Sequence, residues 1–182
     1  MENVILIGFM GSGKTTVGFR LSYRLRRTVI DTDKEIEQEE QRSISDIFAA
    51  DGEAYFRDRE TMCLRRLLNS TGNQIISVGG GLPLREENRK LLRELGQVFY
   101  LQASAATIYE RVKHDTTRPL LQGSDPQAKI QKMLAERDRY YREAADSIIN
   151  VDGKDFEHIL CEIAEAVDKR QNGMQGRREK QV

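Results

Sequence analysis

Residues 8–15 carry the clearest chemistry in this sequence, because they read G-F-M-G-S-G-K-T. Their spacing matches G-x-x-x-x-G-K-S/T, a pattern typical of phosphate-binding loops between a strand and a helix. The glycines let backbone N–H groups converge on one anion, and the following helix adds the positive end of its dipole. Lys14 can reach the outer phosphates of a nucleoside triphosphate, and Thr15 can offer its hydroxyl to Mg²⁺. The alternative is an ordinary glycine-rich turn with a surface lysine.

Two acidic residues, Asp31 and Asp33, follow a short β-branched run at residues 28–30. They alternate in a chain that leaves a strand, so their side chains can point to different sides. One can face Mg²⁺ beside the glycine-rich loop, and the other can face the hydroxyl of an acceptor. The alternative is that both acids cap the next helix, where carboxylates are favoured.

Two arginines fall on apolar faces of expected helices. Arg57 shares a stripe with two leucines in a helix expected over 53–69, and Arg137 lies within an apolar stripe of a helix expected over 126–144. An unpaired buried guanidinium costs several kcal/mol, so each arginine needs an anionic partner. A ligand carboxylate bound through two hydrogen bonds would supply one. The alternatives are an internal salt bridge or a side chain that extends to water.

Three consecutive glycines and one loop arginine complete the candidate site. Gly79, Gly80 and Gly81 follow an expected strand at 74–78, and Arg118 lies in a polar segment. Glycines would let a small ligand approach the backbone N–H groups, and Arg118 could close over the phosphates. A plain turn and a solvated arginine are the alternatives.

Alternating strand and helix patterns connect these residues. Such alternation favours an α/β fold in which helices cover both faces of a parallel sheet. Ligands gather at the carboxyl ends of such strands, where the loop, the two acids and the three glycines all fall. The expected strands are 4–7, 28–30, 74–78, 98–101 and 148–151. The expected helices are 16–25, 34–40, one beginning at Ser43 and interrupted at Gly52, 53–69, 85–95, 105–113, 126–144 and 155–168.

The bulk composition restricts the class of protein. The chain has 182 residues, enough for one domain, and its 29 basic and 29 acidic residues give no net field to attract nucleic acid or an anionic membrane. No apolar run approaches the roughly 20 residues that cross a bilayer, and an early strand leaves no room for a signal peptide, so we expect a cytoplasmic protein. The two cysteines and two histidines are isolated, which disfavours a structural metal site. Residues 170–182 are polar and expected to be disordered.

Several motifs in order resemble those of shikimate kinases, P-loop enzymes of the nucleoside-monophosphate-kinase type. The glycine-rich loop alone is shared with many nucleotide-binding proteins, whereas the whole ordered set is much more specific. The resemblance runs from about residue 4 to the last helix. Its carriers are I-G-F-M-G-S-G-K-T at 7–15, D-T-D at 31–33, S-I-S-D-I-F-A-A-D-G-E-A-Y-F-R at 43–57, S-V-G-G-G at 77–81, T-R-P-L-L at 117–121 and A-E-R-D-R-Y-Y at 135–141.

The resemblance implies a three-layer P-loop fold with a five-stranded parallel sheet. It implies a single kinase domain over 1–169, with a helical substrate-binding segment at about 33–61 and a mobile lid at about 112–125. It further implies transfer of the γ-phosphate of ATP to the 3-hydroxyl of shikimate, giving 3-phosphoshikimate and ADP for chorismate and aromatic amino-acid biosynthesis. Mg²⁺ would be the cofactor, ATP and shikimate the small-molecule partners, and the enzyme a monomer with no nucleic-acid or membrane partner.

The resemblance also implies residue roles. Asp33, Lys14 and Arg118 would be catalytic, with Asp33 accepting the proton of the attacking hydroxyl, and Thr15 and Asp31 would support the metal. Shikimate would be bound by Asp33, Arg57, Gly79, Gly80, Gly81 and Arg137. ATP would be bound by Gly11, Ser12, Gly13, Lys14, Thr15, Thr16, Arg111 and Arg118, with Arg111 near the adenine.

Two other functions share part of this pattern. A gluconate-type or nucleotide kinase would use the same phosphate-binding loop and lid but bind another acceptor. Two inward arginines favour a carboxylate over a nucleobase, although a sugar acid would also fit. A non-catalytic nucleotide-binding regulatory module would tolerate the loss of Asp33 and Arg118, and this chain retains both.

Overall fold

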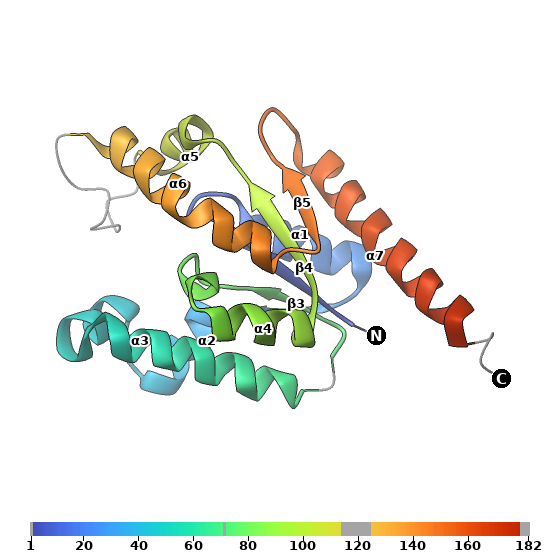
Figure 1. The fold of residues 1–182 in the computed structure, drawn as a ribbon, viewed down its shortest axis with the longest axis horizontal. Helices are drawn as coiled ribbons and strands as arrows, with labels where there is room; N and C mark the ends of the chain where they lie inside the picture. Colours follow the sequence, from blue (N-terminus) through green and yellow to red (C-terminus); the bar gives the residue numbers. More distant parts are fainter. Residues whose placement is uncertain (1, 71, 114–124, 179–182) are drawn as a thin grey trace.

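A five-stranded parallel sheet with strand order β2-β3-β1-β4-β5 forms the centre of the molecule (Figure 1). The computed structural model describes residues 2–70, 72–113 and 125–178. β1 is buried along its whole length, and Ile5 lies opposite Ile76 on one neighbour and Val98 on the other. The predicted α/β class is confirmed. The strands are β1 (Asn3–Ile7), β2 (Thr28–Asp31), β3 (Gln74–Ser77), β4 (Gly96–Gln102) and β5 (Ser147–Asn150).

Helices cover both faces of this sheet, as a parallel sheet with buried apolar strands requires. α1 (Lys14–Leu25) and α7 (Phe156–Arg178) pack together on one face, and α4 (Glu86–Leu95) and α6 (Pro126–Ala144) pack on the other (Figure 1). The remaining helical elements are α2 (Thr32–Glu40), α3 (Ile44–Leu68), the short 3₁₀ turn η1 (Leu82–Leu84) and α5 (Ala105–Val112). Among the described residues, no helix is both long and apolar enough to cross a membrane.

Local signals in the sequence fix several helix boundaries. The hydroxyl of Ser43 accepts a hydrogen bond from the backbone N–H of Asp46 at 3.1 Å and caps α3. Gly52 has φ 82° and ψ 172°, so the helical geometry of α3 breaks where the sequence predicted an interruption. Gly96 follows the last residue of α4, also as expected.

The end of the chain corrects one expectation. α7 continues to Arg178, so residues 170–178 are helical rather than disordered. Arg170 explains part of the difference, because it pairs with Glu2 at 2.8 Å and with Asp146 at 3.1 Å and holds the helix against the sheet. The glutamines and arginines of this segment are also good helix formers. Residues 114–124, with Arg118 and most of the predicted lid, lie outside the described residues.

Two glycines offer a matched test of this packing. A Cβ at Gly96 would lie 2.8 Å from the carbonyl carbon of Asn3 and closer still to its oxygen, whereas one at the exposed Gly173 of α7 would meet nothing. Gly96→Ala should therefore destabilise the protein by about 1–3 kcal/mol as β4 moves from β1. Gly173→Ala should stabilise it by up to about 1 kcal/mol. Urea unfolding measures both changes, and equal stability of the two variants would contradict the β1–β4 packing.

Candidate active site

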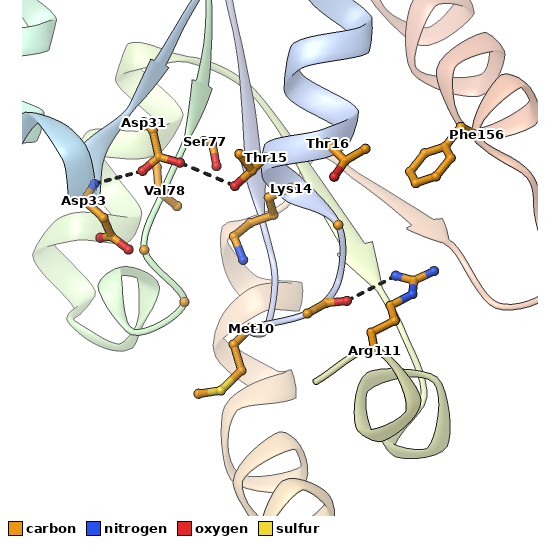
Figure 2. A pocket seen from close by; sticks show the side chains of 14 residues that line it. Met10, Lys14, Thr15, Thr16, Asp31, Asp33, Ser77, Val78, Arg111 and Phe156 are labelled. Carbon is orange, nitrogen blue, oxygen red and sulfur yellow. Dashed lines mark hydrogen bonds between the residues drawn. The ribbon is translucent and has the colours of Figure 1, made fainter. Parts of the chain in front are cut away.

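A pocket of about 470 Å³ opens at the carboxyl ends of β1, β2 and β3. Figure 2 shows Asp31 and Asp33 on one side of Lys14, and Arg111 and Phe156 on the other. The structure therefore brings together residues that are far apart in the sequence. The predicted residues that line this pocket are Gly11, Gly13, Lys14, Thr15, Thr16, Asp31, Asp33, Gly79, Gly80 and Arg111.

The glycine-rich loop is shaped by left-handed backbone conformations. Gly11 has φ 74°, and Gly13, at the N-cap of α1, has φ 102°, a region that side chains of other residues disfavour. Lys14 donates from Nζ to the carbonyl oxygens of Gly8 at 2.8 Å and Phe9 at 3.0 Å, so its ammonium lies across the loop. Gly13 offers no side chain to cap α1, which leaves the positive helix end facing the pocket. Ser12 is buried and does not line the pocket wall.

Arg111 and Phe156 form the end of the pocket farthest from Asp33. Arg111 donates to the carbonyl oxygens of Gly11 and Ser12, both at 3.1 Å, which fixes its guanidinium beside the loop. The guanidinium carbon of Arg20 lies 4.3 Å from the centre of the Phe156 ring. Sequence reasoning missed Phe156, because an aromatic residue at the start of an amphipathic helix resembles an ordinary core residue.

The two predicted acids lie beside Lys14 with different partners. Asp31 accepts a hydrogen bond from the N–H of Asp33 at 3.1 Å, which caps α2, and its other oxygen accepts one from the Thr15 hydroxyl at 3.5 Å. Asp31 thus both caps a helix and faces the loop. Burial, reinforced by the negative charge of Asp31, raises the pKa of Asp33 to about 6.

Arg57 forms the internal salt bridge that was one alternative for it. Its guanidinium donates two hydrogen bonds to Glu53, at 2.9 and 3.2 Å, and one to Glu60 at 2.8 Å. A guanidinium has five N–H donors, so the three bonds leave two for another anion. Burial opposes the charged form, but the two carboxylates outweigh it and raise the pKa of Arg57.

Glu60 is a second residue that sequence reasoning missed. Its side chain is fully buried against Arg57. Its position three residues after Arg57 and four before Leu64 could have identified it, because this spacing puts all three on the buried side of α3.

The three glycines let these charged groups approach the backbone. A Cβ at Gly79 would lie 2.5 Å from an oxygen of Asp33 and 2.9 Å from an oxygen of Glu60. A Cβ at Gly81 would lie 2.5 Å from the guanidinium carbon of Arg57. A side chain at Gly79 or Gly81 would therefore shift one of these charged groups from its present position.

Arg137 lies beside the glycine segment. Like Arg57 and Gly81, it is outside the wall of the main pocket. Its guanidinium carbon is 5.6 Å from the ring centre of Phe9. No carboxylate in the part of the chain that the structure describes forms an ion pair with it. Tyr141, next to Arg137 on α6, donates to the carbonyl oxygen of Gly80 at 2.6 Å and so connects this region to the glycines. Burial raises the pKa of Tyr141 to about 12, although Arg137 opposes the change.

Comparisons with known proteins show the family of the chain. A protein-family model for shikimate kinase matches residues 10–168. The shikimate kinase of Chromobacterium violaceum is 47% identical over 148 residues, which are 81% of this chain and 80% of the relative. A solved shikimate kinase from Acinetobacter baumannii in complex with shikimate has a TM-score of 0.87 and 35% identity, covering 93% of this chain and 94% of that one. A gluconokinase from Sinorhizobium meliloti, with a TM-score of 0.60, 16% identity and coverage of 97% of both chains, shares the fold alone.

The buried Glu60 predicts a pH-dependent stability. Burial raises its pKa from 4.5 to about 7, although Arg57 opposes this, so the folded protein binds the proton more tightly than the unfolded chain. The contribution of Glu60 to stability is then complete below about pH 4.5 and is lost as the pH rises through 7. Between about pH 5 and pH 8, the unfolding free energy of the wild type should fall relative to that of Glu60→Gln by on the order of 1–3 kcal/mol.

Urea titrations across this range measure the difference. Glu53→Gln is the matched control, because Glu53 contacts the same guanidinium but is 64% exposed, so its curve should stay parallel to that of the wild type. Parallel curves for wild type and Glu60→Gln would contradict the raised pKa.

Proposed function

This chain belongs to the shikimate kinase family, and we propose how its residues share the transfer of a phosphoryl group from ATP to shikimate. The family reaction phosphorylates the 3-hydroxyl of shikimate and releases ADP, a step of aromatic amino-acid biosynthesis. The gluconate-type and non-catalytic alternatives are not favoured, because the family match covers residues 10–168.

One observation carries the proposed division of roles. A single pocket has the anion-binding loop at its centre, Asp33 at one end and the flat groups of Arg111 and Phe156 at the other. A phosphate chain bound along the loop would reach both ends. The nucleobase of ATP then stacks near Arg111 and Phe156, and its terminal phosphate points toward Asp33.

The phosphates contact the N–H groups of residues 11–16, and Lys14 neutralises part of their charge. Phosphoryl transfer depends mainly on alignment and charge neutralisation rather than on covalent chemistry by the protein. Arg118, which lies outside the described residues, supplies a further positive charge to the transferred group.

The proposed Mg²⁺ site fits the residues present. The hydroxyl of Thr15 and a carboxylate oxygen of Asp31 are 3.5 Å apart on the pocket wall, and oxygen atoms are the ligands that Mg²⁺ prefers. Within the described residues, no group of three histidine, cysteine or acidic side chains could hold a metal alone. This suits Mg²⁺, which takes one or two protein oxygens and completes its shell with phosphates and water. When bound, it neutralises charge on the phosphates.

Shikimate lies between Asp33 and the two arginines in this proposal. Arg57 and Arg137 bind its carboxylate, and the backbone of Gly79, Gly80 and Gly81 contacts its ring. Asp33 orients the 3-hydroxyl toward the terminal phosphorus and accepts its proton as the new O–P bond forms and the bond to the β-phosphate oxygen breaks. The proposal includes a monomeric, cytoplasmic enzyme without nucleic-acid or membrane partners, and the net charge of zero supports the absence of those two kinds of partner.

The carboxylate-binding role predicts a selective effect on the Michaelis constant. Arg57→Ala and Arg137→Ala should each raise the KM for shikimate about 10- to 100-fold, because each removes a charge-assisted hydrogen bond worth roughly 1.5–3 kcal/mol. The KM for ATP should change little. A coupled ADP-release assay measures both constants. Arg59→Ala on α3 and Arg139→Ala on α6 are matched controls, and an unchanged shikimate KM in both Arg57→Ala and Arg137→Ala would remove these residues from the role.

The role of Asp33 predicts a selective effect on turnover. Asp33→Asn keeps the shape of the side chain but cannot accept the proton, so kcat should fall about 10²- to 10⁴-fold. ATP binding, measured by calorimetry, should stay within about twofold of the wild type. Asp58→Asn, an exposed carboxylate on α3, is the control and should behave as the wild type. Near-normal turnover of Asp33→Asn would exclude Asp33 as the proton acceptor.

A further inference from the structure

We propose that Asn88 is a positioning residue for the shikimate site. It lies on α4, behind the pocket, and connects the helix that carries Arg57 to the backbone that Arg57 lies against. The inference rests on the proposed binding of the shikimate carboxylate by Arg57, and its test separates the two ideas.

Both ends of the Asn88 amide are engaged inside the protein. The side chain is fully buried, its Nδ2 donates to the carbonyl oxygen of Leu82 at 2.9 Å, and its Oδ1 accepts from the Thr61 hydroxyl at 2.8 Å. The same hydroxyl lies 3.1 Å from the carbonyl oxygen of Arg57, one turn earlier on α3. A single side-chain amide therefore links the turn of α3 that holds Arg57 to the turn that follows the three glycines.

The neighbouring side chains show that this backbone segment is held from behind. Arg89 donates to the carbonyl oxygens of Pro83 at 2.9 Å and Leu84 at 3.0 Å, and Tyr141 donates to that of Gly80 at 2.6 Å. With the bond from Asn88 to Leu82, four carbonyl groups between residues 80 and 84 are bound by side chains of α4 and α6. Of these residues, Gly80 also lines the main pocket, so the bonds fix a segment that leads out of the pocket wall.

Stability alone does not require the buried pair of Asn88 and Thr61. Replacing both partners of a buried hydrogen bond by apolar groups of the same shape can be nearly neutral, so an apolar contact would hold the two helices as well. A hydrogen bond adds a fixed direction and length. Two other links between α3 and the start of α4, Arg85–Asp58 and Arg65–Glu87, are exposed ion pairs and restrain the helices less.

The link through Asn88 bears on the close contact between the Arg57 guanidinium and Gly81. The Arg57 guanidinium lies so close to Gly81 that not even a Cβ fits between them. Glu53 and Glu60 hold Arg57 but lie on the same helix, so they move with it. The link through Asn88 sets the position of α3 relative to the glycine segment, and a misplacement of even about 1 Å can weaken a binding or catalytic contact severely.

The test compares Asn88→Leu with Asn3→Leu. Asn3 is also buried and also uses both amide ends, to the carbonyl of Leu95 and the N–H of Gln74, both at 2.9 Å, but it lies at the amino end of the sheet, away from the pocket. Asn88→Leu should raise the KM for shikimate about 5- to 20-fold, with the KM for ATP and kcat at saturating shikimate within about twofold. Asn3→Leu should lower the melting temperature about as much as Asn88→Leu does, but it should leave the KM for shikimate unchanged.

Thr61→Val keeps the shape of the side chain and removes its hydroxyl, which bonds Asn88 and also lies 3.1 Å from the carbonyl oxygen of Arg57, so it should raise the shikimate KM in the same selective way by a smaller factor. This variant decides the matter if Asn88→Leu does not fold. The proposal is overturned if neither variant changes the shikimate KM, or if Asn3→Leu raises it equally. Arg57→Ala is measured beside them: an unchanged shikimate KM there overturns both ideas, whereas a raised KM there with an unchanged KM in the Asn88 and Thr61 variants overturns the positioning role alone.

Discussion

Charged side chains from α2 and α3 converge on residues 79–81, three glycines that have no side chains of their own. Asp33 comes from α2, whereas Glu60 and Arg57 come from α3, and all three approach residues 79–81 so closely that a Cβ on the first or third glycine would collide with them. Because this segment leaves the carboxyl end of β3, next to the glycine-rich loop after β1, the charges gather beside a phosphate-binding site. The sheet and the helices packed on it hold these elements in their relative positions.

The electrostatics of this cluster hold Arg57 in place between acidic side chains. Glu60 is buried next to Asp33, an unfavourable arrangement that the Arg57 guanidinium partly offsets. Glu60 and Glu53 hold Arg57 in one orientation, so less side-chain entropy would be lost in the proposed binding of a carboxylate to its two remaining N–H groups. Arg137 has the Phe9 ring beside it and forms no ion pair with an acid among the described residues, so its charge adds to the attraction for an anion.

Local patterns in the sequence predicted the order of strands and helices, the phosphate-binding loop and the start of a helix at Ser43, because each depends on neighbouring residues. The spacing could place Glu60 on the same helix face as Arg57, but it could not show that Arg57 donates to Glu60 rather than to a ligand alone, since a helical stripe gives a face but not a partner. Phe156 was missed because its place beside Arg111 in the pocket wall depends on the packing of two helices, whereas in the sequence it resembles a core residue. The extension of α7 was missed because Arg170 is anchored by Glu2 and Asp146, which are distant in sequence.

The central claim is that two guanidinium groups bind the carboxylate of shikimate, and a binding cycle tests it most directly. Calorimetry would compare shikimate with its neutral carboxamide on the wild type and on the double variant Arg57→Ala/Arg137→Ala. The account predicts that the carboxamide binds the wild type at least about 100-fold more weakly than shikimate, but binds the double variant nearly as well as shikimate does. An equal loss of affinity on both proteins would contradict it, because the carboxylate would then be recognised elsewhere.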